Sequence, residues 1–162
     1  MIAVVQRVLE ARVTVEGKVV GEIGAGMLVL VAVEVGDEAK DVAWMASKLL
    51  TMRIFAQGDK YFDLDLAQMA AAAGASSGIL LVSNFTVAAD TSSGRRPSLS
   101  NAAPPAQGRE LFDALVAEVR KQAGGAGGTG VRVETGAFGA DMRVSLVNDG
   151  PVTFLVQSRE ES

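Results

Sequence analysis

Apolar and polar positions alternate with two different periods along the chain, and the period of each stretch predicts its element. Short runs rich in β-branched residues, bounded by glycine or polar turns, are typical of strands. These runs are residues 2–8, 11–15, 18–23, 27–33, 53–56, 79–82, 131–135, 142–147 and 152–156. Gly17 between two of them predicts a hairpin. Every position of 27–33 is apolar, so we expect this strand at the centre of the sheet, buried on both faces.

Two other stretches repeat their apolar residues at helical spacing and predict helices packed on the sheet. The first follows Asp37, which has the side chain of an N-cap. The two apolar stripes comprise Val42, Met45, Ala46, Leu49 and Leu50, and Leu111, Phe112, Leu115, Val116 and Val119. Residues 61–66 predict an irregular extended segment. Residues 67–78, rich in alanine, glycine and serine, are compatible with a short helix or a surface loop.

These elements predict a single α+β domain, because 162 residues suffice for one sizeable core. We place the domain over residues 1–157 and a polar tail, expected to fray, over residues 158–162. Residues 88–105 lack periodicity and predict a long loop, which in a compact domain is usually functional or disordered. The glycine-rich stretch 124–130 predicts a mobile linker.

Histidine and cysteine are both absent from the sequence. Their absence excludes disulfides, thiolate nucleophiles, zinc thiolate sites and Ser-His or Cys-His pairs within the chain. An enzyme of this composition must use carboxylates, hydroxyls, backbone groups, an ordered water or its substrate for proton transfer. We assign no metal ligand and no cofactor.

The formal net charge of −4 argues against a broadly basic nucleic-acid surface. A protein that grips only one end of an RNA needs a small basic rim, and Arg95 with Arg96 are candidates for one. No apolar run approaches the ~20 residues that span a bilayer. Residues 1–7 alternate like a strand and lack the pattern of a signal peptide, so we expect a cytoplasmic protein with no membrane contact.

The segment from Asn148 to Thr153 separates two apolar runs, and its Asp-Gly pair predicts a hairpin turn. Pro151 fixes its own φ and restricts Gly150, which makes the predicted tip stiff. The carbonyl groups of Gly150 and Pro151 could then approach a ligand closely. By composition alone, a plain turn is the favoured interpretation.

Ser83, Asn84, Phe85 and Thr86 follow a buried strand, and these residue types are also common at ordinary strand ends. The functional alternative is a cleft lined by Thr86 and by the backbone N–H groups of Phe85 and Thr86. Such donors can hold a developing oxyanion, worth ~3 kcal/mol each where measured in other enzymes. On the residues alone, the structural interpretation is favoured.

Other charged residues allow two interpretations each. Arg95 and Arg96 fit a solvated loop as well as a phosphate site. Asp63 and Asp65, two apart, indicate a solvent-facing strand rather than an acid–base pair. Arg7 has apolar neighbours in the sequence. It is therefore expected either at the edge of a sheet or in a site where another group pairs with its charge.

Four motifs occur in a specific order. They are Gln6-Arg7-Val8, Ser83-Asn84-Phe85-Thr86, Gly94-Arg95-Arg96-Pro97-Ser98 followed by Ala102-Ala103-Pro104-Pro105, and Asn148-Asp149-Gly150-Pro151-Val152-Thr153. Each is weak alone, but together they resemble the D-aminoacyl-tRNA deacylases, or D-tyrosyl-tRNA deacylases, from Met1 to about Gln157.

The resemblance implies a homodimer of barrel-like subunits, each a mixed β-sheet with two main helices packed outside, and active sites at the subunit interface. The catalytic residues would be Ser83, Asn84, Phe85 and Thr86. The substrate-binding residues would be Gly150, Pro151, Asn148, Arg7, Arg95 and Arg96. A cis Gly150–Pro151 bond would enter the partner's pocket, with Arg7 close to this tip.

The substrate implied is the ester of a D-amino acid with the 3′-terminal adenosine of tRNA. Its free 2′-hydroxyl would help to activate water, and backbone donors would stabilise the oxyanion. A Thr86 nucleophile is the rival mechanism, although no base is evident to activate it. Two rigid carbonyls holding the α-amino group would make an L side chain clash with the tip, whereas D-amino acids and glycine would be accepted.

The chain departs from the family pattern at two places. Asn84 replaces the usual Gln, and Lys60-Tyr61-Phe62-Asp63 replaces the usual Gly-Lys-Met-Asn, which affects one wall of the pocket. Two alternatives stay open beside this interpretation: a relative that edits L-alanyl-tRNA with a trans Gly-Pro bond, and a non-catalytic dimer that binds tRNA ends.

Overall fold

The computed structural model describes residues 1–124 and 130–158. The expected linker, 124–130, therefore lies largely outside the described residues, and so do residues 159–162 of the expected tail. Ser158, the one described residue of that tail, accepts a hydrogen bond from the Met1 amino group and donates one to Asp41.

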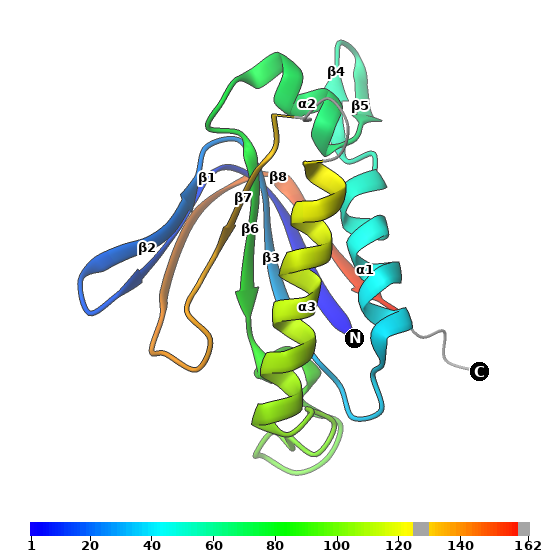
Figure 1. Ribbon diagram of the computed structural model, residues 1–162, viewed down its shortest axis with the longest axis vertical. Helices are drawn as coiled ribbons and strands as arrows, with labels where there is room; N and C mark the ends of the chain where they lie inside the picture. The colour runs from blue at the N-terminus through cyan, green and yellow to red at the C-terminus, as the bar shows by residue number, and fades with distance from the viewer. Residues whose placement is uncertain (125–129, 159–162) are drawn as a thin grey trace.

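Six strands form one mixed sheet, as the sequence predicts (Figure 1). They are β1 (Ile2–Val15), β2 (Lys18–Ile23), β3 (Gly26–Ala32), β6 (Gly78–Ser83), β7 (Arg132–Thr135) and β8 (Arg143–Gln157). The strand order is β2-β1-β3-β6-β7, and β8 pairs with β1. β1 is antiparallel to β2, β3 and β8, whereas β3–β6 and β6–β7 are parallel. The expected central position of β3 is confirmed.

The sheet curls until its two ends nearly meet. A Cβ atom at Gly21 of β2 would lie 2.3 Å from the carbonyl oxygen of Thr135 in β7. Only a glycine allows the backbones to approach so closely. The expected barrel-like sheet is therefore confirmed.

Two long helices, α1 (Ala39–Thr51) and α3 (Pro105–Ala123), pack against each other on the same face of the sheet (Figure 1). They bury the predicted apolar stripes, including Met45, Leu49, Leu115 and Val119, against side chains of β1, β3 and β6. A second apolar cluster lies on the other face of the sheet, inside the curl, and contains Val13, Leu28 and Leu80.

Several predicted boundaries were wrong. Residues 2–8 and 11–15 form one strand, β1, because β8 pairs along nearly all of it. The N-cap of α1 is Glu38, while Asp37 is buried and accepts hydrogen bonds from the Met1 amino group and the Glu34 N–H. The irregular segment is a strand, β5 (Lys60–Leu64), which pairs with β4 (Phe55–Gln57). Of the two alternatives for residues 67–78, the short helix is confirmed: it is α2 (Leu66–Ala73), capped by Asp65.

The predicted hairpin at Asn148–Thr153 was also wrong. Both flanking runs belong to β8 and pair with the same strand, β1. Asn148 faces Val8 and Thr153 faces Gln6, so residues 149–152 bulge out opposite the single residue Arg7. Asp-Gly breaks the ladder locally, but the length of β1 allows the pairing to resume beyond the break.

Candidate active site

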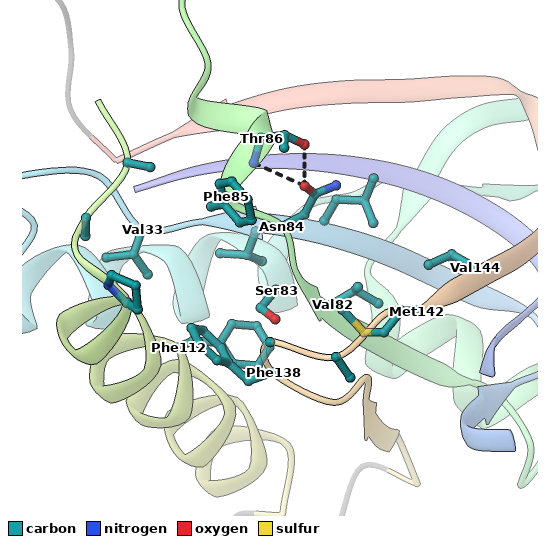
Figure 2. Close-up of a pocket in the computed structure, with 18 of the residues that line it drawn as sticks. Val33, Val82, Ser83, Asn84, Phe85, Thr86, Phe112, Phe138, Met142 and Val144 are labelled. Atoms are coloured by element: carbon teal, nitrogen blue, oxygen red, sulfur yellow. Dashed lines mark hydrogen bonds between the residues drawn. The ribbon is translucent and has the colours of Figure 1, made fainter. Parts of the chain in front are cut away.

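A cavity of about 1360 Å³ opens beside the end of β6. Its walls come from β3, β6, the start of α3, the segment 138–144 and the short 3₁₀ helix η1 (Phe85–Ala88). All four residues of the predicted catalytic run, Ser83, Asn84, Phe85 and Thr86, line it (Figure 2). Most of the remaining wall is apolar, while Phe85 and Thr86 are exposed to solvent.

The run is held by backbone and side-chain hydrogen bonds. The Asn84 N–H donates to the Val31 carbonyl at 2.8 Å, which extends the β3–β6 pairing to the start of η1. The Asn84 Oδ1 atom accepts from the Thr86 N–H at 3.2 Å and from the Thr86 hydroxyl at 2.6 Å (Figure 2). Asn84 thus caps η1 with its side chain.

The two backbone donors predicted for an oxyanion differ in the structure. The Thr86 N–H is engaged by Asn84. The Phe85 N–H has no hydrogen-bond partner among the described residues, and Phe85 is 59% exposed. Only the Phe85 N–H is therefore ready to bind an incoming oxygen.

The tip formed by Gly150 and Pro151 is exposed, and its peptide bond is cis. A Cβ atom at Gly150 would lie 1.9 Å from the backbone nitrogen of Val152, so no other residue fits this backbone. The Asn148 Nδ2 atom donates to the carbonyls of Arg7 and Val152, at 2.9 and 3.1 Å, and ties both ends of the bulge together.

The Arg7 side chain holds the bulge of residues 149–152 in place. Its side chain is buried, and its Nε atom lies 3.0 Å from the Asp149 carboxylate. Its Nη1 atom donates to the carbonyls of Ile54 and Tyr61, and its guanidinium lies 4.6 Å from the centre of the Tyr61 ring. Arg7 is therefore a paired position, and it joins the tip to β5.

The tip and its anchors lie outside the cavity of their own chain. None of Arg7, Asn148, Gly150 and Pro151 is among the residues that line it. The structure brings the predicted residues together in two groups, with the strand-end run in the cavity and the tip group on the bulge.

Arg95 and Arg96 belong to neither group. Both are exposed in the loop after η1, where a backbone bridge joins Asp90 to Ser98. Hydrogen bonds from Ser92, through its side chain and its backbone, lower the pKa of Asp90 in this loop. Because Arg95 and Arg96 are exposed, they are available to an external anion.

The cavity residues that were not predicted as site residues include three with large apolar side chains. Phe112 was predicted only as part of a helix stripe, while Phe138 and Met142 lie where no candidate was named. Phe112 and Phe138 have ring centres 6.1 Å apart and form an aromatic wall (Figure 2). The sequence feature that could have indicated this aromatic wall is Phe138, which lies between Gly136 and Gly139.

Asp63 and Asp65 are both engaged away from the cavity. The predicted solvent-facing strand was wrong for both: the Asp63 side chain is 15% exposed and pairs with Arg53, and Asp65 lies beyond β5 and caps α2. The described residues hold no cluster of three or more potential metal ligands.

Comparisons with known proteins identify the family. The sequence model described as "D-Tyr-tRNA(Tyr) deacylase" matches residues 4–157. The D-aminoacyl-tRNA deacylase of Pelobacter propionicus is 48% identical over 97% of this chain and 99% of its own length. The chain belongs to the D-aminoacyl-tRNA deacylase family. A deacylase of that name from Azotobacter vinelandii is 49% identical over 98% of this chain and 100% of its own length.

Solved structures agree with the deacylase fold. A protein named c-Myc DNA unwinding element binding protein superimposes with a TM-score of 0.85 at 31% identity, over 99% of this chain and 100% of its own. A probable eukaryotic D-amino acid tRNA deacylase has the same fold, with a TM-score of 0.76 at 17% identity over 96% and 97% of the two chains. The resemblance drawn from the four motifs, and with it the prediction of a hydrolase, is confirmed. No helix of this deacylase, within residues 1–124 and 130–158, is long and apolar enough to cross a membrane.

Proposed function

We propose that this protein hydrolyses the ester bond of D-aminoacyl-tRNA, and of glycyl-tRNA mischarged on other tRNAs, while sparing L-aminoacyl-tRNA. The observation that carries the proposal is the separation of the exposed Gly150–Pro151 tip from the cavity that holds the Phe85 N–H. In the proposed arrangement, the exposed tip of one chain enters the cavity of a second chain and covers it.

A second copy of the chain supplies the missing half. The face of the sheet away from α1 and α3 carries an apolar row across three strands, because Leu155 and Leu30 both pair with Val4. Leu155 is 67% exposed, and Leu30 also lines the cavity. Burying this row against its copy would set the tip of one subunit at the cavity of the other, with two-fold symmetry.

The chemistry requires no side-chain base. Water attacks the ester carbonyl carbon while the Phe85 N–H stabilises the oxyanion. The bond from the carbonyl carbon to the 3′ oxygen of ribose then breaks, and the proton of the water reaches that oxygen by way of the neighbouring 2′-hydroxyl. Free amino acid and tRNA leave. The absence of histidine and cysteine is consistent with this route.

Chirality is read by the tip backbone. The carbonyls of Gly150 and Pro151 hold the α-amino group, and an L side chain would then point into the tip and clash. A clash discriminates more strongly than the loss of one methylene contact, which is worth about 1 to 3 kcal/mol. Arg95 and Arg96, exposed in the loop after η1, would hold phosphates of the 3′ end.

The test compares deacylation of D-tyrosyl-tRNA and L-tyrosyl-tRNA that differ only in chirality, with glycyl-tRNA as a third substrate. We expect rapid hydrolysis of the D ester and the glycyl ester, and a rate on the L ester close to that without enzyme. Equal rates on the two tyrosyl esters would contradict chiral rejection. Binding without hydrolysis would favour the non-catalytic tRNA-end binder. A preference for L-alanyl-tRNA would favour the L-specific relative.

A further inference from the structure

We propose that Asn84 is a positioning residue that turns the Thr86 hydroxyl into a hydrogen-bond acceptor for an O–H group at the reacting ester. This inference rests on the proposed function and assigns two side chains within it. The carrying observation is that one atom, Asn84 Oδ1, accepts both from the Thr86 N–H, at 3.2 Å, and from the Thr86 hydroxyl, at 2.6 Å.

The direction of these hydrogen bonds follows from the backbone. The Thr86 N–H can only donate, so the Asn84 atom facing it must be the oxygen and not the NH₂ group. The Thr86 hydroxyl approaches the same oxygen and must therefore also donate (Figure 2). A hydroxyl has one proton and two acceptor lone pairs. With its proton engaged by Asn84, Thr86 presents only acceptor sites to the cavity that it lines.

This arrangement opposes a threonine nucleophile. A hydroxyl nucleophile must lose its proton to a base during attack, and a neutral amide oxygen is not such a base. Accepting a hydrogen bond, by contrast, costs Thr86 no proton. Thr86 is exposed, so the ribose hydroxyl beside the ester or the attacking water can reach it. Thr86 orients that group, and the proton balance of the hydrolysis stays between water and ribose.

The geometry depends on the length of the side chain at position 84. An Asn oxygen closes a compact turn onto the backbone two residues ahead. Glutamine, the usual residue in the family motif, carries its oxygen one methylene further out. The acceptor state of Thr86 is thus a property that this chain derives from Asn84.

The test is a double-mutant cycle in the full-length protein, read by steady-state deacylation of D-tyrosyl-tRNA. Asn84→Ala and Thr86→Val should each lower kcat about tenfold with KM within about twofold, as expected for one lost hydrogen bond. The double variant should be no slower than Thr86→Val alone, because Asn84 acts through the hydroxyl. Thr86→Ser, which keeps the hydroxyl, should stay within about threefold of the parent.

Asp90→Ala is the matched control. The Asp90 Oδ1 atom accepts from the Ser92 N–H at 2.8 Å, the same contact two residues ahead, outside the cavity lining. The kcat of Asp90→Ala should equal that of the parent protein. Losses that multiply to about a hundredfold in the double variant would overturn the proposal, as would a loss beyond about a thousandfold in Thr86→Val alone, which indicates a nucleophile.

A substrate with a 2′-deoxy terminal adenosine identifies the donor. Because the proposed proton route runs through the 2′-hydroxyl, this ester should react slowly, and the readout is the ratio of the residual single-turnover rates of the parent protein and Thr86→Val. If the ribose hydroxyl donates to Thr86, Thr86→Val should have no effect on this substrate. If water donates, the tenfold effect should remain. Both results support an acceptor role, whereas a faster Thr86→Val enzyme on the deoxy ester would contradict it. An enzyme inactive on every aminoacyl-tRNA would instead refute the proposed function itself.

Discussion

At the scale of single residues, the site depends on backbone groups that a few side chains hold in place. Asn84 engages the Thr86 N–H and leaves the Phe85 N–H free. At the tip, hydrogen bonds from the Arg7 and Asn148 side chains fix the bulge around Gly150. The residues that touch the substrate in this account contribute mainly backbone N–H and C=O groups.

The Phe85 N–H can be removed without removing the chain bend. Proline suits the first position of a helix because its φ is preset and its N–H is not needed there, and Asn84 before it (φ −150°, ψ 91°) lies outside the helical region that a following proline disfavours. We expect Phe85→Pro to lose about 10²- to 10³-fold in kcat relative to Phe85→Ala, which keeps the N–H. Equal rates for the two variants would show that this donor is not used.

Arg7→Lys should loosen the tip, since a lysine ammonium cannot reach the Asp149 carboxylate and the Ile54 carbonyl together. We expect a loss of about 1 to 3 kcal/mol in the free energy of unfolding, measured with urea. Arg53→Lys is the control, because the exposed Arg53–Asp63 pair contributes little, about 0 to 1 kcal/mol. Equal losses in both variants would contradict a special role for Arg7.

At the scale of elements, periodicity predicted the sheet, its central strand and both long helices, because burial imposes those patterns on the sequence. It missed what depends on pairing between distant segments. The break at Asp149-Gly150 has the local chemistry of a hairpin, yet β1 is long enough to pair with both sides. Likewise, the resemblance alone names Ser83 to Thr86 as the proposed catalytic run, and the engagement of Thr86 by Asn84 follows only from coordinates.

Gly108 offers a stabilising substitution within α3. A Cβ atom there would lie 3.6 Å from the Phe138 ring, an ordinary contact, and alanine favours a helix over glycine by about 1 kcal/mol. Gly108→Ala should raise the thermal midpoint by several degrees, as measured by calorimetry. Gly78→Ala should lower it, because its Cβ would lie 2.0 Å from the Arg132 carbonyl. A lower midpoint for Gly108→Ala would contradict the packing described for α3.

At the scale of the whole molecule, the proposed dimer would share each site between two subunits and bury the exposed apolar row around Leu155. Leu155→Asp should place a charge in that row and yield monomers in sedimentation experiments, with deacylation lost along with the partner's tip. Val20→Asp, at another exposed apolar position on β2, should leave the dimer intact. A Leu155→Asp monomer that retains full activity would contradict a shared site.

The most direct test of this account is the activity of mixed dimers that combine Phe85→Pro with Gly150→Ala, a change for which the tip has no room. When the two substitutions lie on different chains, one pocket and one tip stay intact on opposite subunits, and about half of the parental activity on D-tyrosyl-tRNA should return. When both lie on one chain paired with an unaltered chain, neither site is complete, and activity should be lost. The reverse result would show that each tip serves its own pocket and would contradict the account.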